Sequence, residues 1–183
     1  MKSPKSVRIA GKKLSDILEK HARFVRGEEG GERADLAGAD LQNVDFTKAN
    51  LTYANFAGAK LVGACLREAK LGSGDFSKAN LHKADLRRAD LTEAHFPGAD
   101  LSEALVSGVE AFRADFQNAN LRGADLGMTN FRDAAVRGAN FQGARLNATI
   151  LRETNLEGAD LSGTDLSTAL LPRNYAKTGA ARS

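Results

Sequence analysis

A five-residue period constrains the fold of this chain more than any other feature of its sequence. From Leu36 to Leu171 every fifth residue is Leu, Phe or Val, with Ala111 as the one exception, which gives 28 consecutive units without an insertion. The residue two places before each of these centres is mostly Ala, and the residue directly before it is mostly Asp or Asn. A period this regular is typical of a repeat protein.

Five residues match the period of neither regular secondary structure. On an α-helix five residues rotate by about 500°, so the leucines would wind around the surface, and on a strand an odd period sends successive leucines to opposite faces. If each unit is instead a short extended segment followed by a corner, every centre and every preceding Ala can point to one interior. The period therefore predicts a solenoid.

The phenylalanines indicate how many sides each coil of the solenoid has. Four of them, Phe56, Phe76, Phe96 and Phe116, occupy centre positions at intervals of twenty residues. A coil of four units would stack these rings in one column at about 4.8 Å, the spacing of hydrogen-bonded strands. The 28 units then predict about seven coils in a rod roughly 34 Å long. Because four inward centres crowd the interior, only a small residue such as Ala fits beside each one.

The units ADLAG, ANLTY, ANFAG and ADLSG resemble those of the pentapeptide-repeat family, over residues 34–173 or about three quarters of the chain. The resemblance implies an all-β solenoid, a right-handed quadrilateral parallel β-helix. It also implies a protein-binding function without catalysis, and often a homodimer. Some bacterial members of the family mimic duplex DNA and bind DNA gyrase or topoisomerase IV, which alters sensitivity to quinolones or other topoisomerase poisons.

The segments that flank the repeat have a different composition. Apolar residues at helical spacing predict a short N-terminal capping α-helix from Leu14 to Arg26, with Ser15 as its N-cap and Gly27 as its stop. The glycines of residues 27–31 could suggest a phosphate loop, but two glutamates between them favour a simple turn. The expected organisation is a basic flexible arm (1–13), a capping helix and turn (14–33), the β-helix (34–173) and a flexible tail (174–183).

Two places in the repeat are candidates for binding. At the C-terminal end Pro172 lacks the N–H needed to continue a ladder, so Leu170, Leu171 and Tyr175 are the candidate contact of a homodimer. Around residues 105–112 the repeat weakens, and Phe112 either folds back beside the undersized Ala111 or stays exposed to a partner. The residues of this candidate partner-binding patch are Tyr53, Leu105, Phe112 and Ile150.

Catalytic and metal-binding chemistry is not indicated by the sequence. The histidines His21, His82 and His95 fall on the helix and on two different sides of the coil, so they are expected to be exposed and to form no triad or metal site. The aspartates occupy one corner position, where a short side chain accepts local N–H groups, so a structural use is favoured over calcium binding. We expect no enzyme activity, no cofactor and no metal.

The charge distribution separates the ends of the chain from its body. Residues 1–33 carry nine Lys/Arg against five Asp/Glu, residues 34–171 carry fourteen against eighteen, and residues 172–183 carry three against none. The body is therefore mildly acidic, and no side forms a purely acidic stripe. A basic arm could bind nucleic acid or an anionic membrane, but such arms are usually solvated and no aromatic residues interleave its cations. The cations of this arm are Lys2, Lys5, Arg8, Lys12 and Lys13.

The leading interpretation is a non-enzymatic cytoplasmic protein-interaction scaffold. The single cysteine, Cys65, allows no internal disulfide, and no apolar run reaches the roughly 18 residues needed to span a bilayer. The alternative is the DNA mimic that binds DNA gyrase or topoisomerase IV, and direct binding of nucleic acid is not favoured. The repeat determines the inward residues and leaves the outward residues free, so the outward residues are where a partner would be recognised.

Overall fold

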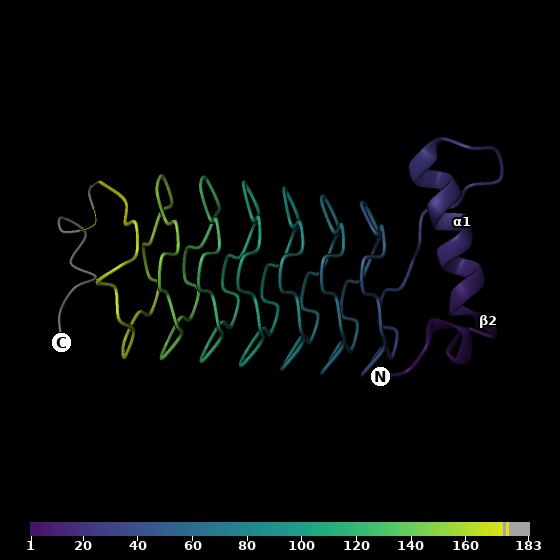
Figure 1. The fold of residues 1–183 in the computed structure, drawn as a ribbon, viewed down its shortest axis with the longest axis horizontal. Helices are drawn as coiled ribbons and strands as arrows, with labels where there is room; N and C mark the ends of the chain where they lie inside the picture. The colour runs from purple at the N-terminus through teal and green to yellow at the C-terminus, as the bar shows by residue number, and fades with distance from the viewer. Residues whose placement is uncertain (174, 176–183) are drawn as a thin grey trace.

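The computed structural model describes residues 1–173 and Tyr175 of the chain. Its regular elements all precede the repeat: the 3-10 helix η1 (Pro4–Ser6), the strands β1 (Arg8–Ile9) and β2 (Lys12–Lys13), and the helix α1 (Leu14–Arg26). The rest is a stack of coils, one behind another, with α1 lying across the N-terminal end of the stack (Figure 1).

The coils are joined by parallel pairing between residues twenty positions apart. Asp35 pairs with Asn55, Asn55 with Asp75, and the same offset continues to the pair Ile150 and Leu170. Each pairing is a single bridge and not a long strand, because the extended part of a unit is only a few residues long. The observed offset equals four units per coil, as the column of phenylalanines predicts.

Each corner between sides is a hydrogen-bonded turn. In the first unit the Ala39 N–H donates to the Leu36 carbonyl at 3.1 Å, and the third turn residue, Gly38, has a φ of 64°. The same left-handed conformation recurs at this position along the rod, often without glycine, as at Lys83 with a φ of 57°. Such a φ is costly for residues with a Cβ, so the corners without glycine carry backbone strain at this position.

The Asp and Asn residues before the centres stabilise these corners. The Asp45 carboxylate accepts the Thr47 N–H at 2.9 Å and the Thr47 hydroxyl at 2.6 Å. The same bond from the residue two positions ahead recurs at most Asp and Asn positions of the repeat, for example from Gln117 to Asp115 at 2.9 Å. These are Asx turns, in which a short side chain satisfies a corner N–H that the ladder leaves free.

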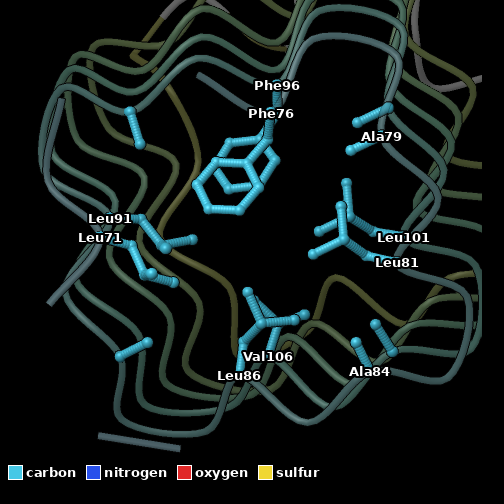
Figure 2. Packing of buried hydrophobic residues seen from close by; sticks show 14 of the residues in the cluster. Leu71, Phe76, Ala79, Leu81, Ala84, Leu86, Leu91, Phe96, Leu101 and Val106 are labelled. Atoms are coloured by element: carbon cyan, nitrogen blue, oxygen red, sulfur yellow. The ribbon is translucent and has the colours of Figure 1, made fainter. Parts of the chain in front are cut away.

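The interior is filled with apolar side chains. Adjacent rings of the column Phe56, Phe76, Phe96 and Phe116 stack with centroids 4.6–4.8 Å apart. Figure 2 shows Phe76 and Phe96 overlapping, with leucines and Val106 pointing in from the other sides and alanines between the sides. Nearly all inward centres between residues 36 and 156, together with their Ala neighbours, are buried.

Residues 1–13, which the sequence predicts to be a flexible basic arm, make defined backbone contacts in this structure. Lys2 pairs in parallel with Val44, its N–H donates to the Asn43 carbonyl at 2.6 Å, and its carbonyl accepts the Asp45 N–H at 3.0 Å. Residues 8–13 then form an antiparallel hairpin of β1 and β2. The arm lies against the free edge of the first coil because that edge offers unpaired backbone groups.

Helix α1 differs from expectation in its N-cap and in its histidine. Lys13, and not Ser15, is the N-cap residue, and it makes no side-chain capping bond, while Gly27 ends the helix at a φ of 69° as expected. His21 is fully buried, contrary to the prediction of an exposed side chain, and its Nδ1 accepts the Ala34 N–H at 3.1 Å. His21 is seven residues after the buried Leu14 and therefore shares its helix face.

Candidate interaction surface

Only the outward residues of each unit are available to a partner, because the interior is filled. Most of them are small or charged, so the few large apolar side chains among them stand out. On the repeat these are Met128, which is 69% exposed, Tyr53, which is 51% exposed, and Leu170, which is 42% exposed. They lie on separate parts of the rod and do not form one apolar face.

The structure does not bring the four residues of the predicted partner-binding patch together. Leu105 lies in the ladder between Asp85 and Asp125, on a different side of the coil from Phe112. Tyr53 shares a side with Phe112 but is three coils away, about 14 Å at the spacing of paired strands. The patch predicted from sequence is therefore dispersed along and around the rod.

The sequence left two alternatives for Phe112, a ring folded back beside Ala111 or a ring exposed to a partner, and the structure lies between them. Ala111 points inward and is fully buried, but the Phe112 ring stays on the outside and is half-buried. The guanidinium carbon of Arg113 lies 4.8 Å from the ring centroid, a cation–π contact that covers part of the ring. Phe112 is thus a half-buried aromatic residue on the outside of the rod, with a cation against its ring.

Ile150 lies on the same side of the coil as Phe112 but two coils further along, next to the C-terminal candidates. It pairs with Leu170, so the two apolar side chains are adjacent on one ladder. Beside them is an open hollow of about 840 Å³ that combines apolar residues with three arginines. The residues of this hollow that bear on the predicted dimer contact are Arg132, Arg152, Leu171, Arg173 and Tyr175. The rest of the predicted tail, residues 174 and 176–183, lies outside the described residues.

Met128 is a prominent surface residue that the sequence interpretation missed. It borders an open hollow of about 360 Å³ that is also lined by three arginines, Ser107 and Gly108. The arginines are Arg67, Arg87 and Arg88. The residue type could have indicated it, because a Met at the third turn position is unusual in a repeat that mostly places Gly, Lys or Glu there.

The charges of the rod largely neutralise one another between coils. Lys48 with Glu68, Lys83 with Glu103, Arg137 with Glu157 and Arg145 with Asp125 form ion pairs twenty residues apart, at 2.9–3.6 Å. All of these pairs lie on the surface, where each contributes at most about 1 kcal/mol. Their main effect is to interleave positive and negative charge, so that no side is a continuous acidic or basic stripe.

Three aspartates at corner positions, Asp45, Asp85 and Asp160, have a pKa below the usual range. Hydrogen bonds from the Thr47 hydroxyl and N–H lower the pKa of Asp45, and the corresponding bonds from Ser162 lower the pKa of Asp160. Burial raises the pKa of Asp85, but hydrogen bonds from Arg87 and its charge outweigh that effect, so this pKa is lowered too. Each of these carboxylates is bound to its own corner and is charged at neutral pH.

The polar residues with catalytic potential are scattered. His82 Nδ1 lies 2.9 Å from the Ser102 hydroxyl, His95 is exposed, and Cys65 Sγ lies 3.1 Å from the Thr47 hydroxyl. Over residues 1–173 and Tyr175, no three His, Cys, Asp or Glu side chains gather closely enough to hold a metal ion. In the same residues no helix has the length and apolarity needed to cross a membrane.

Comparison with known families decides the class of the protein. The family described as pentapeptide repeats matches in eight copies, over residues 32–68, 75–108, 89–127 and 129–167. The chain belongs to the pentapeptide-repeat family. Members of this family form right-handed quadrilateral β-helices and are in general structural or interaction proteins, not enzymes.

Several solved structures of pentapeptide-repeat proteins are similar to this chain. HetL, involved in heterocyst differentiation regulation in the cyanobacterium Nostoc sp. strain PCC 7120, is 27% identical over 78% of this chain and 74% of its own, with a TM-score of 0.47. A protein of the Arabidopsis thaliana thylakoid lumen is 29% identical over 60% of this chain and 72% of its own, with a TM-score of 0.45.

QnrB1, a plasmid-mediated fluoroquinolone resistance protein, is a more distant relative. In one trypsin-treated form it is 20% identical over 81% of this chain and 89% of its own, with a TM-score of 0.35. A comparison with curated proteins found no significant match. The pentapeptide-repeat family is therefore the level at which comparison assigns this protein.

Proposed function

We propose that this pentapeptide-repeat protein is a non-enzymatic, cytoplasmic protein-interaction scaffold. Its helix α1 would cover the N-terminal edge of the first coil, and its outward side chains would recognise the partner. The observation that carries the proposal is the division of the rod into a filled interior and a variable exterior. Because the interior is filled with side chains, it has no room for a ligand, and any binding takes place on the outer surface.

The distribution of surface groups supports a protein partner. Exposed Met128, half-buried Phe112 and several arginines are the residue types enriched in protein interfaces. The sides of the coil that carry Met128 and Phe112 also bear ion pairs, Arg145 with Asp125 and Arg132 with Glu153, which suit the polar rim of an interface. The buried thiol of Cys65, beside the Thr47 hydroxyl, is compatible with a reducing cytoplasm.

The DNA-mimic alternative requires a strongly acidic face, and the ion pairs along the rod work against one. Lys48, Lys83 and Arg137 each stand beside an acidic residue of the next coil. A supercoiling assay with DNA gyrase or topoisomerase IV, with and without ciprofloxacin, separates the two functions. Inhibition or rescue at micromolar protein would favour the DNA mimic, whereas no effect is expected from the scaffold.

Self-association through the C-terminal end is a compatible proposal. Leu171 and Tyr175 border a hollow of about 840 Å³ at this end of the rod, and the neighbouring Leu170 is exposed. A second copy placed there would cover the free edge of the last coil. Light scattering tests it: the mass of a dimer that becomes monomeric in Leu170→Glu supports this contact, and a monomer at all concentrations excludes it.

Site-specific photo-crosslinking in the host cell tests the scaffold directly. A photoreactive amino acid is placed at Tyr53, Phe112 or Met128, one position at a time, and at inward Leu101 as the control. The scaffold predicts a light-dependent adduct with a defined protein from at least one outward position and none from Leu101. The proposal fails if no outward position gives an adduct above the background without light.

A further inference from the structure

The N-terminal hairpin holds its basic side chains in fixed positions. Ala10 and Gly11 form its tight turn with φ values of 47° and 81°, and the Arg8 guanidinium donates to the Gly11 carbonyl at 2.9 Å. Val7 and Ile9 are half-buried and pack against the hydrophobic core of the rod. The cations of residues 1–13 therefore belong to a folded surface and not to a solvated tail.

These cations lack the neutralising partners that cations of the rod have. Residues 1–15 contain five Lys/Arg and no Asp/Glu. Among the described residues, none of the five lies within 4.0 Å of a carboxylate, unlike Lys48 and Lys83 on the rod. The five, Lys2, Lys5, Arg8, Lys12 and Lys13, are all exposed. A cluster of unpaired cations on a fixed surface attracts an anionic partner.

Next to this cluster lies a hollow of about 530 Å³ between the hairpin and α1. Ile9, Ala10 and Ile17 give it apolar walls, and both isoleucines are half-buried. Arg8, Lys12, Lys13, Lys20 and Arg33 supply cations around it. Three acidic residues also line the hollow, and one of them, Glu32, is held by Lys20 at 2.6 Å. The volume is in the range that accommodates several side chains of a bound segment.

We propose that this hollow binds an acidic, apolar segment of a partner protein. An apolar side chain of the segment packs on Ile9 and Ile17 while its carboxylates face Arg8, Lys12 and Lys13. The proposal rests on the scaffold function and names the chemistry of one partner. A protein segment fits better than a nucleic acid, because Ile9 and Ile17 offer contacts for an apolar side chain and no aromatic residue lines the hollow for base stacking.

Fluorescence anisotropy with a labelled peptide tests the proposal on the full chain. The probe is a short peptide of glutamates around a Leu-Leu pair, and its comparison peptides replace the leucines by serines or the glutamates by lysines. The variant Lys12→Glu with Lys13→Glu reverses the charge of β2. Its matched control, Lys60→Glu with Lys78→Glu, makes the same charge change at two exposed positions of the rod.

The expected result is saturable binding of the glutamate–leucine peptide that weakens at least about tenfold in the β2 variant and less than about twofold in the rod control. The serine peptide should bind at least about threefold more weakly, and the lysine peptide should not bind. Equal loss in both variants overturns the proposal, since it indicates attraction to overall charge. Equal binding of the serine and leucine peptides also overturns it.

Duplex DNA and vesicles containing phosphatidylserine serve as competing probes. If either binds in a β2-dependent manner while the acidic peptide does not, the hairpin is a polyanion site and the proposal is wrong. The scaffold function is tested separately by photo-crosslinking on the rod, which does not involve β2. A partner captured on the rod with no peptide binding at the hairpin would remove this inference and leave the scaffold intact.

Discussion

Phe76 and Phe96, twenty residues apart in sequence, stack in the interior with ring centroids 4.6 Å apart and planes inclined by only 6°. This separation is close to the distance between paired strands, so the ring spacing and the backbone spacing are set by the same coil rise. The pair therefore links the sequence period directly to the geometry of the rod.

Replacing a ring within this column should destabilise the rod in proportion to the volume removed. Phe96→Ala is expected to lower the free energy of unfolding by about 3–5 kcal/mol, because the filled interior cannot collapse onto the cavity. Phe96→Leu should cost less than about 1.5 kcal/mol, because Leu occupies the centres of the other sides. Urea denaturation followed by circular dichroism measures both.

The matched control for this column is Phe112→Ala, which removes a ring that is half-buried on the outside. Its loss should be about 1 kcal/mol or less, mainly from the contact with Arg113. If Phe112→Ala costs as much as Phe96→Ala, the Phe112 ring is part of the core and the assignment of inward and outward positions is incorrect.

Gly31 should tolerate no side chain, because the helix α1 passes directly over it. A Cβ added to Gly31 would clash with the Phe24 nitrogen and lie 2.6 Å from the Phe24 Cα, and both are backbone atoms that cannot move independently. Gly31→Ala is expected to cost roughly 1–3 kcal/mol and to loosen the N-terminal unit.

The comparison for Gly31→Ala is Gly127→Ala, where the nearest atom would be 3.5 Å from the new Cβ. That substitution should change the free energy of unfolding by about 0.5 kcal/mol or less. Hydrogen exchange of α1 amides reports the local effect. Unchanged exchange in Gly31→Ala would mean that α1 does not lie against Gly31 as described.

His21 should make the docking of α1 sensitive to acid. Burial lowers its pKa, the charge of Arg33 lowers it further, and the backbone of Thr52 opposes these effects more weakly. Because the folded pKa lies below the ordinary 6.5, the unfolded state binds the proton more readily. The contribution of His21 to stability is thus complete above about pH 6.5 and is lost as pH falls below it.

Hydrogen exchange of α1 at about pH 7.5 and about pH 5.5, corrected for intrinsic exchange, checks this dependence. Protection of α1 should fall at the lower pH in the wild type and in His95→Gln, whose His is exposed. His21→Ala should be less protected at both pH values and should lose the pH dependence. A dependence that persists in His21→Ala would assign it to another group.

Asp45 should give a separate loss of stability at lower pH. The pKa of Asp45 is lowered by the hydrogen bonds from Thr47, so its contribution is complete above the ordinary value of 3.8 and disappears as pH falls through the folded value. Asp45→Asn keeps the acceptor oxygen and should remove this acid-dependent part. Asp45→Ala removes the acceptor and should cost about 1 kcal/mol at neutral pH. Thermal melts from neutral to acid pH test both, and identical acid limbs in the wild type and Asp45→Asn would refute the assignment.

The fold of the repeat was predictable because every unit meets the same requirement, an apolar centre and a small neighbour that fit the narrow interior. The offset of twenty residues and the stacking of Phe56 on Phe76 follow from the period and from the phenylalanine column. The role of the corner aspartates follows from residue type alone, as the bond from Thr47 to Asp45 illustrates. A period read from many equivalent units is not changed by one unit that deviates from it. A loop or site that occurs once gives no such repeated evidence.

The ends and the surface could not be predicted in the same way, because their residue arrangements are not repeated along the chain and so give no pattern to read. The pairing of Lys2 with Val44 depends on a free coil edge that local sequence does not describe, and the burial of His21 depends on where α1 docks. The four residues of the predicted patch share an apolar character but not a location. Outward residues have no repeated requirement, so their grouping is visible only in three dimensions.

The central claim is that inward residues build the rod while outward residues carry its function. Quantitative capture of partners from the host cell tests it with four forms of the protein. They are the wild type, Phe96→Leu, Phe112→Ser with Met128→Ser, and Lys12→Glu with Lys13→Glu. The wild type and Phe96→Leu should capture the same partner in equal amount, and at least one of the outward variants should capture about tenfold less or lower. Full capture by both outward variants, with loss in Phe96→Leu, would contradict it.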